Sequence, residues 1–425
     1  MSIHHSQLRV VIVGGGFAGF RVARALTRNG PRRTADGRAV HVTLVDRNEY
    51  FTYTPLLYDV ASGTVAASHA STPFRTLLWD NALSLVQSTV NAVDIERRSL
   101  ITDAGCIPYD RLVLAPGSVA SLPPSQAQAH EPSRTNHRGL DRHTMPFMTL
   151  ADATAIRERL RRHCLRLVGQ PPTPGDLTFV IVGGGPKGVE LIFDLADFLE
   201  RHLLPEYGLA RERLRLVLIS KEANLMHEFV SAFSTAARTA MATRGIKLLT
   251  GRYVIGATDH QIHLEGGRVV DTQMVIWAAG IAPHPLLRDL GIPLVDRAIP
   301  VTDALQLPTH PEVYLAGNCA RSDDGNGNRV PATASLAQQH GRFLARALTA
   351  DLMGAPLPQF RYVSRGNAVR FGQGDGLAEL GSGRTAIHVR GPAASAFRTA
   401  IDILEVPGFS QKRGTLGSFL RVPGL

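Results

Sequence analysis

The length, composition and charge of this chain exclude several classes of protein. Its 425 residues exceed what one hydrophobic core supports, so we expect two or three domains. Hydrophobic residues at 44% and charged residues at 19% are typical of a globular protein without long disordered tracts. The net charge is +10, but the arginines are scattered and are not interleaved with aromatic residues, so we expect no nucleic-acid partner.

The sequence contains neither a membrane-spanning pattern nor a pair of cysteines at redox spacing. Its longest apolar runs are only as long as strands, and the polar residues 1–8 lead directly into a strand, so we expect no spanning helix and no secretory signal. Cys106, Cys164 and Cys319 lie far apart, which excludes a local redox disulfide. This usage is typical of a reducing compartment, so we expect a cytoplasmic protein.

The first predicted element is a buried strand that ends in a glycine-rich turn. Apolar residues 10–13 precede Gly14-Gly15-Gly16-Phe17-Ala18-Gly19, and residues 17–28 carry apolar positions at helical spacing. In this G-x-G-x-x-G pattern the first glycine makes the tight bend, the second lets the backbone approach a diphosphate, and the third lets helix pack on strand. The helix N-terminus favours the negative charge, so the turn predicts a dinucleotide site.

The next strand, predicted for residues 40–45, ends in Asp46. A carboxylate at this place can accept hydrogen bonds from both hydroxyls of a ribose. Its distance from the glycines exceeds the usual spacing of about twenty residues, and the polar loop at residues 30–38 accounts for the excess. The structural alternative is that Asp46 only caps a turn.

A third strand leads out of this first part of the chain. It ends in the turn Ala115-Pro116-Gly117-Ser118. Residues 121–147, rich in Pro, Gln and His, are predicted to be a surface connection. A helix at residues 151–167 and a proline-rich linker at residues 171–174 follow.

A second glycine-rich turn follows the apolar residues 179–182. It has the order Gly183-Gly184-Gly185-Pro186-Lys187-Gly188 and the same spacing of glycines as the first turn. Two copies, each after a β-branched strand, predict two dinucleotide sites in one chain. The last strand of this part, predicted for residues 274–277, ends in Ala278-Ala279-Gly280.

The second strand of this part is predicted for residues 214–219. It ends differently from the corresponding strand of the first part, which ends in Asp46. Ser220 and Lys221 follow it in place of an acid, and Arg252 lies near the next strand. A hydroxyl beside a cation suits the 2′-phosphate of NADPH better than a bare ribose, which gives a slight preference for NADPH. Glu222 could still serve NADH.

The C-terminal part contains one more strand and two predicted helices. The strand at residues 313–316 ends in Gly317-Asn318-Cys319-Ala320, and a helix is predicted for residues 331–352. A second helix at residues 392–406 has an apolar face without tryptophan, so docking on the protein body is at least as well supported as membrane contact. That face consists of Phe397, Ala400, Ile401 and Leu404. The histidines show no clustering of the kind that binds a metal.

These motifs, in this order, resemble those of the two-dinucleotide-fold flavoproteins and most closely those of type II NADH:quinone oxidoreductases. The segments that carry the resemblance span residues 9 to about 348: Gly14 to Gly19, Asp46-Arg47-Asn48, Pro55-Leu56-Leu57-Tyr58, Gly183 to Glu190, Trp277 to Gly280, Gly317 to Ala320, and Pro331 to Gly341. The resemblance implies an α/β protein with two Rossmann-like domains, the second inserted in the first, and a small C-terminal region. The implied bounds are 1–150 and 290–350 for the FAD domain, 151–289 for the NAD(P)H domain, and 351–425 for the C-terminal region.

The resemblance also implies which residues bind and react. Residues 54–58 would pack beside the flavin ring, although ordinary core packing is the alternative for this stretch, and Glu190 would face the nicotinamide and acceptor pocket. Glu190 and Gln339 are the expected catalytic residues; as an alternative, Glu190 could only interact with the helix dipole. The expected FAD-binding residues are Gly14, Gly16, Phe17, Ala18, Gly19, Asp46, Arg47, Pro55, Leu56, Ala115, Gly117, Gly317, Asn318 and Ala337. Those for NAD(P)H are Gly183, Gly185, Pro186, Lys187, Gly188, Ser220, Lys221, Ala279 and Gly280.

Three positions depart from the family pattern. Asn318 stands where the family has an aspartate that bonds the flavin, so FAD affinity is expected to fall without vanishing. On the predicted helix 331–352, Ser335 and His340 replace two of the family's glutamines, and Gln339 keeps one. We expect the acceptor to bind at the face lined by Glu190, Gln339 and His340, and a non-respiratory acceptor to fit there better than a long-chain quinone.

The sequence thus predicts an FAD-dependent oxidoreductase that passes electrons from NADH or NADPH to a quinone or another small conjugated acceptor. A specialised flavin-dependent oxidase or dehydrogenase, and a non-catalytic FAD-binding or redox-sensing protein, stay open as alternatives. Sulfide:quinone oxidoreductases share the scaffold but need cysteines at the flavin, which Cys164 alone does not supply. Peripheral contact with the inner face of the membrane through the C-terminal region, and a homodimer, are open as well.

Overall fold

A computed structural model describes residues 7–78, 83–121, 139–323, 330–381 and 386–420. The polar start of the chain and residues 122–138 of the predicted connection lie outside this part. The chain forms two compact units: Met1–Thr52, Ser71–Val119 and Ala282–Val363 make up the first, and Tyr53–Ala70, Ala120–Ile281 and Ser364–Leu425 make up the second. These bounds differ from the predicted domains, because residues 53–70 and the C-terminal region group with the second dinucleotide fold.

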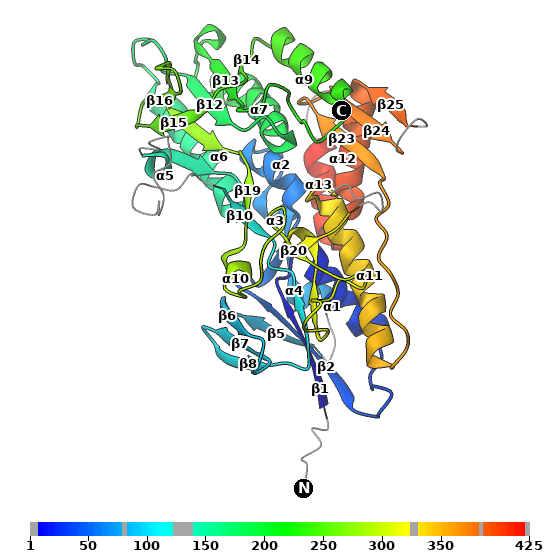
Figure 1. Cartoon of the computed structure of the whole chain (residues 1–425). Helices are drawn as coiled ribbons and strands as arrows, with labels where there is room; N and C mark the ends of the chain where they lie inside the picture. The colour runs from blue at the N-terminus through cyan, green and yellow to red at the C-terminus, as the bar shows by residue number, and fades with distance from the viewer. Residues whose placement is uncertain (1–6, 79–82, 122–138, 324–329, 382–385, 421–425) are drawn as a thin grey trace. The chain divides into compact units, whose positions relative to one another are not determined.

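The first unit is built on a parallel sheet of five strands in the order β21-β9-β1-β2-β5. Figure 1 shows α1 and α11 side by side against it. Its elements are β1 (Gln7–Val13), α1 (Phe17–Asn29), β2 (Ala39–Asp46), β3 (Tyr50–Thr52), β4 (Ser71–Pro73), α4 (Phe74–Leu77), β5 (Leu83–Gln87), β6 (Val90–Asp94), β7 (Ser99–Thr102), β8 (Gly105–Pro108), β9 (Arg111–Leu114), α10 (Pro285–Arg288), β20 (Ile299–Pro300), β21 (Val313–Leu315), β22 (Ala320–Arg321) and α11 (Ala334–Leu352).

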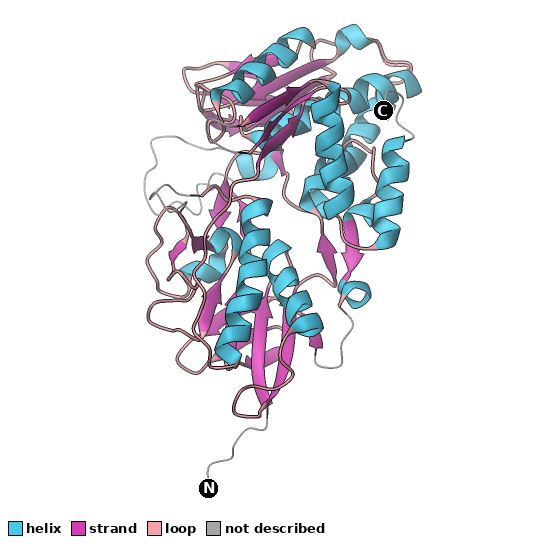
Figure 2. Cartoon of the chain, turned by 90° about the vertical axis from the view of Figure 1, so that its right-hand side faces the viewer, coloured by secondary structure: helices cyan, strands magenta, loops and turns pink. Residues whose placement is uncertain are grey.

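The second unit contains a parallel sheet in the order β11-β18-β12-β13-β14. Figure 2 shows its strands in magenta and its helices in cyan. Its elements are α2 (Leu57–Ala61), α3 (Ala67–Ala70), α5 (Leu140–His143), β11 (Thr144–Pro146), α6 (Leu150–Arg166), β12 (Thr178–Val182), α7 (Pro186–Phe198), α8 (Leu204–Glu206), β13 (Arg215–Ile219), α9 (Ser231–Thr243), β14 (Lys247–Leu249), β15 (Val254–Ala257), β16 (Gln261–Leu264), β17 (Val269–Asp271), β18 (Met274–Trp277), β23 (Gly366–Arg370), β24 (Gly376–Leu380), β25 (Ile387–Arg390), α12 (Pro392–Glu405) and α13 (Phe409–Leu420). β10 (Ser118–Ala120) and β19 (Ile281–Pro283) lie where the chain passes between the units.

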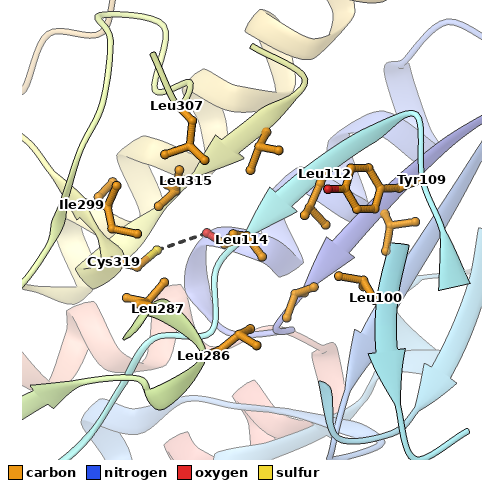
Figure 3. Close-up of a cluster of buried hydrophobic side chains, with 14 of the residues drawn as sticks. Leu100, Tyr109, Leu112, Leu114, Leu286, Leu287, Ile299, Leu307, Leu315 and Cys319 are labelled. Atoms are coloured by element: carbon orange, nitrogen blue, oxygen red, sulfur yellow. Dashed lines mark hydrogen bonds between the residues drawn. The ribbon is translucent and has the colours of Figure 1, made fainter. Parts of the chain in front are cut away.

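Buried apolar side chains explain the sheet of the first unit. Val10, Val11 and Ile12 of β1 are fully buried, as expected for a parallel strand covered on both faces. Figure 3 shows the core on one face of the sheet, where the Cys319 thiol lies 3.1 Å from the carbonyl oxygen of Leu114. Burial raises the pKa of Cys319 to about 12, so this cysteine is a packing residue.

The predicted fold class is confirmed, one detail of the prediction is wrong, and one of two alternatives for α12 is excluded. The connection at residues 121–147 contains α5 and the edge strand β11, which pairs in parallel with β18; a strand of three residues is too short to leave a periodic pattern. Docking on the body, one of the two alternatives for the apolar face of α12, is excluded, because Phe397 is 39% and Leu404 71% exposed. The opposite, polar face is buried instead, through Ser395, Thr399 and Asp402.

Candidate functional site

The first glycine-rich turn has the geometry of a dinucleotide cradle. Gly14 has a φ of +92°, and a Cβ there would collide with the carbonyl of Ala115. A Cβ at Gly19 would collide with the carbonyl of Gly14, so these two glycines are required by packing. Gly16 differs, because a Cβ there would meet nothing within 4 Å. The space beside Gly16 is therefore open to a bound group.

Asp46 lies next to this turn at the end of β2. Its Oδ2 accepts the N–H of Gly15 over 2.6 Å and its Oδ1 accepts the N–H of Asn48 over 2.8 Å. The carboxylate thus caps a turn, as the structural alternative states, and it also lies beside the cradle. A cavity of about 50 Å³ adjoins Asp46 and is lined in part by Phe74 and Gln87. Arg47, the next predicted residue, is exposed.

The structure brings the other predicted FAD residues of the first unit together. Gly317, with a φ of +73°, faces the methyl groups of Ala18 and Ala337, which would lie 3.9 Å and 3.6 Å from a Cβ at Gly317. The Nδ2 of Asn318 donates to the Oγ of Ser118 over 3.0 Å. Phe17 packs edge-on against Phe51, and Gly117 has open space where a Cβ would be. Sequence motifs that are far apart therefore converge on the end of one sheet.

In the second unit the second turn repeats the geometry of the first. A Cβ at Gly183, where φ is +133°, would lie 2.8 Å from the carbonyl carbon of Ala278, and one at Gly188 would collide with the carbonyl of Gly183. A Cβ at Gly185 would meet nothing within 4 Å. Pro186 begins α7, a position that suits its missing N–H. The chain therefore carries two cradles of the same design.

The predicted residues around the second cradle differ in exposure. Ser220 is only 2% exposed, and its Oγ accepts the N–H of Glu222 over 3.2 Å. Lys221 is exposed and lies 3.6 Å from the Glu222 carboxylate. Burial lowers the pKa of Lys187 to about 8, and its Nζ lies 2.6 Å from the sulfur of Met148. The carbonyl of Ala279 accepts the indole N–H of Trp277 over 3.0 Å.

The short stretch at residues 54–58 contains two more predicted FAD residues. Pro55 is partly exposed in a short 3₁₀ helix, and Leu56 is fully buried. The side chain of Tyr58 packs on Phe147 with ring centres 5.4 Å apart. The burial of Leu56 agrees with the alternative of core packing.

Glu190 is a buried carboxylate in the first turns of α7. It is 4% exposed, and its Oε1 accepts the backbone N–H of Arg370 over 3.2 Å. The same oxygen lies 3.4 Å from Nε of Arg398 on α12, whose guanidinium also pairs with Asp402. Glu190 is thus held by the C-terminal region as well as by its own helix.

The predicted acceptor residues on α11 are engaged inside the first unit. The side-chain amide of Gln339 donates to the carbonyl of Val363 and accepts its N–H, each over 3.0 Å. His340 is fully buried between the N–H of Gly317 and the hydroxyl of Ser322. His340 therefore does not line an open pocket, contrary to the expectation, because its ring supports the loop that precedes Asn318.

A group of buried charges in the second unit was not predicted from the sequence. Asp59 on α2, Asp194 on α7 and Arg370 at the end of β23 meet there. Arg370 is 311 positions from Asp59, and no motif connects them. The only signal in the sequence was the spacing of acids at helical intervals along α7.

Comparisons with known proteins agree with this geometry. The pyridine nucleotide-disulphide oxidoreductase family matches residues 8–341. The demethylphylloquinone reductase NdbB of Synechocystis is 28% identical over 408 residues, which is 94% of this chain and 92% of that protein. A type II NADH:quinone oxidoreductase of Staphylococcus saprophyticus is 21% identical over 399 residues, covering 93% and 94%.

Solved structures show the same fold. NDH2 from Plasmodium falciparum in complex with NADH superimposes with a TM-score of 0.83 at 19% identity, over 97% of this chain and 98% of that chain. The sulfide:quinone oxidoreductase of Aquifex aeolicus superimposes with a TM-score of 0.73 at 19% identity, over 96% and 92%. The family match covers most of the chain and confirms the resemblance found in the motifs. The chain belongs to the pyridine nucleotide-disulphide oxidoreductase family and is a flavoenzyme similar to type II NADH:quinone oxidoreductases.

Proposed function

We propose that this protein binds FAD in the first unit and NADH or NADPH in the second, and transfers electrons from the nicotinamide to a quinone. The pair of cradles with an open second glycine is the observation that carries the proposal, because Gly16 and Gly185 leave room where packing does not require a glycine. FAD, when bound, supplies the two-electron chemistry between nicotinamide and acceptor. Gly16, Asp46 and Asn318 would hold it, and Gly185 and Lys221 would hold the nicotinamide nucleotide.

The selectivity between the two nicotinamide donors is expected to be small. The hydroxyl of Ser220 is buried against the glycine turn, so the exposed Lys221 and Arg252 are the cations left to meet a 2′-phosphate. The backbone N–H of Arg252 donates to the Ser220 carbonyl over 3.0 Å. Glu222, which lies beside Lys221, offers a carboxylate for a free ribose. The slight preference for NADPH therefore depends on Lys221 and Arg252.

Glu190 is the buried carboxylate of the second unit to which we assign a part in proton transfer to the acceptor. Its Oε1 accepts the N–H of Arg370 and lies next to the guanidinium of Arg398. Because Glu190 is buried, bulk water does not reach the carboxylate. A carboxylate held in this way keeps a fixed orientation, which proton transfer requires. We assign to Glu190 the delivery of a proton to an oxygen of the acceptor.

A peripheral place at the inner face of the membrane is part of this proposal. No helix in the described part of the chain is both long and apolar enough to cross a bilayer. α12 and α13 instead present the exposed apolar side chains Phe397, Leu404, Leu416 and Leu420. An apolar helix face on the surface suits shallow contact with lipid, where an apolar quinone is dissolved.

A small acceptor is the second candidate, and a specific observation favours it. Gln339 is engaged by Val363 and His340 is buried, so neither offers a free group to a long-chain quinone. A specialised oxidase or dehydrogenase acting on a small conjugated molecule would use the same scaffold. Comparison of acceptors of different chain length separates the two candidates.

Anaerobic mixing experiments test the proposal. Purified protein is expected to bind FAD without a covalent bond, and NADH or NADPH should bleach the flavin. Addition of a short-chain quinone should then restore the oxidised spectrum. Protein that binds no FAD, or whose flavin neither donor reduces, would refute the proposal. Bleaching by sulfide in place of NAD(P)H would instead support a sulfide-oxidising enzyme.

A further inference from the structure

Three buried acids lie on one face of α7. Asp194 and Asp197 follow Glu190 by four and seven residues, a spacing that places all three side chains along the same side of the helix. Each is buried. Acidic side chains are almost never fully buried unless they are paired. The row of acids therefore requires either partners or a function.

Arg370 is the central partner of these acids. Its Nη2 donates to both oxygens of Asp59, over 2.8 Å and 3.0 Å, and to Oδ2 of Asp194 over 3.3 Å. Its backbone N–H donates to Glu190, as described above. We call Asp59, Asp194 and Arg370 the Arg370 cluster. One residue thus connects the cluster to the carboxylate that we assign to the acceptor.

The positive charges around the cluster are too few for the acids. Among the described residues, two arginines pair with four buried carboxylates here: Arg370 and Arg398 with Asp59, Glu190, Asp194 and Asp402. A buried carboxylate without a full counter-charge is relieved by binding a proton. Burial raises the pKa of Asp59 to about 6 and raises that of Asp194 well above its ordinary value.

The other charged groups that face the cluster do not remove this excess. Asp197 is paired with Arg244 and Arg201 and accepts the N–H of Gln373 over 2.6 Å. The ring of Phe419 on α13 lies 5.6 Å from the guanidinium of Arg370 and adds no formal charge. In the Arg370 cluster, Asp59 and Asp194 therefore share one counter-charge, the guanidinium of Arg370.

A small cavity adjoins the cluster. It has a volume of about 20 Å³, and Asp59, Asp194 and Arg370 line it together with the buried hydroxyl residues Ser395 and Thr399. This volume is enough for one water molecule. The Nε of Arg370 is buried and has no hydrogen-bond partner among the described residues, so Arg370 retains a donor for such a water.

The cavity also reaches towards the surface of the unit. Thr64 and Gln373, which line it, are partly exposed, whereas Asp59 and Asp194 are buried. The hydroxyls of Ser62 and Thr64 lie 3.1 Å apart on the same side. Polar groups thus extend from the partly exposed residues to the Arg370 cluster.

We propose that Asp194 and Asp59 share a proton taken up through this cavity, and that Asp194 supplies it to Glu190 for reduction of the acceptor. The inference rests on the proposed function, because reduction of a quinone by NAD(P)H consumes one proton from solvent in each turnover. The O–H bond on Asp194 breaks as one forms on Glu190, which lies four residues earlier on the same face of α7. The proton then passes from Glu190 to the acceptor oxygen. NAD(P)H supplies the two electrons and the other hydrogen. Asp194 acts through Glu190 and touches no substrate, so it is a positioning residue that relays a proton.

The test compares two oxidants of the NADH-reduced, FAD-loaded full chain. A water-soluble benzoquinone takes up electrons and protons, whereas ferricyanide takes up electrons only. Asp194→Asn is expected to slow reoxidation by the quinone by about tenfold or more above about pH 6, because a proton donor is lost. Reoxidation by ferricyanide should stay at the wild-type rate, and Asp194→Glu should restore the quinone reaction.

Asp176→Asn is the matched control. Asp176 is also a buried aspartate of the second unit and is paired with an arginine, Arg213. Unlike Asp194, Asp176 does not line the cavity. If Asp194→Asn does not fold, Asp59→Asn tests the same proton with the same expected result. Wild-type rates with quinone at every pH, or equal losses with both oxidants, would overturn the relay while leaving the proposed function intact. A wild-type protein that no quinone reoxidises would overturn both.

Discussion

The backbone N–H of Gly317 donates a hydrogen bond to Nδ1 of His340 over 3.0 Å. Because Nδ1 accepts this bond, the ring is neutral and carries its proton on Nε2, which lies 2.9 Å from the Ser322 hydroxyl. Burial lowers the pKa of His340 to about 3. The glycine turn that leads into Asn318 therefore depends on a histidine that stays neutral.

We predict that His340→Gln makes the protein more tolerant of acid. Between about pH 6.5 and pH 3 the unfolded chain binds a proton at His340 that the folded chain does not, so the wild type loses stability as the pH falls. The full shift in the pKa of His340 corresponds to a change in the free energy of unfolding on the order of 3–5 kcal/mol. Urea unfolding at several pH values measures it, with the exposed His227→Gln as control. Parallel curves for wild type and His340→Gln would contradict the assignment.

The open and the packed glycines of the first turn should respond differently to alanine. Gly16→Ala is expected to fold with nearly wild-type stability and to lose FAD affinity, because its Cβ enters open space where the diphosphate would lie. Gly19→Ala is expected to destabilise the fold itself, since its Cβ collides with the carbonyl of Gly14. Thermal unfolding without FAD, followed by FAD titration, separates the two effects. Equal FAD affinity in Gly16→Ala and wild type would place the cofactor elsewhere.

Asn318→Asp is predicted to strengthen FAD binding. The asparagine donates to the Ser118 hydroxyl over 3.0 Å, and an aspartate can accept from the same hydroxyl while adding the family's negative charge. We expect an affinity gain of up to about tenfold, or about 1 kcal/mol. Equilibrium dialysis measures the dissociation constant of FAD directly. Weaker binding of FAD by the variant would contradict the prediction and would show that asparagine suits this position better than aspartate.

Gln339→Ala is predicted to slow reoxidation by the acceptor indirectly, because Val363 loses its contacts with α11, while flavin reduction by NAD(P)H stays nearly unchanged. The structure adds that the variant loses two hydrogen bonds to Val363, at a cost of roughly 1–2 kcal/mol of stability. Gln306→Ala is a suitable control, because Gln306 also bonds a backbone carbonyl in the first unit, that of Pro311. Equal losses in both half-reactions would make Gln339 a packing residue.

The parts of this protein that follow from local chemistry could be predicted from the sequence. Each glycine turn combines a buried strand, a tight bend and a helix start within a few residues. Its sequence pattern can therefore be recognised before the fold is known. Asp46 could be placed beside the first turn because it ends the strand that pairs with β1. Its two hydrogen bonds to backbone N–H groups needed the structure.

Features that depend on distant partners could not be predicted in this way. Arg398 and Asp402 give α12 a polar face that a sequence pattern assigns to solvent, yet in the interior Arg398 pairs with Glu190 and Asp402 accepts the hydroxyl of Tyr53. The sequence pattern therefore left docking of the apolar face open as an alternative, although the opposite face of α12 is the buried one. His340 presents the same difficulty, because its burial depends on Gly317 and Ser322.

Anaerobic reduction of the purified, FAD-loaded protein tests the central claim most directly. One equivalent of NADH or NADPH is predicted to bleach the flavin spectrum, and one equivalent of a short-chain quinone is predicted to restore it with formation of the quinol. Flavin that stays oxidised with both nicotinamides, or reduced flavin that no quinone reoxidises, would contradict an NAD(P)H:quinone oxidoreductase.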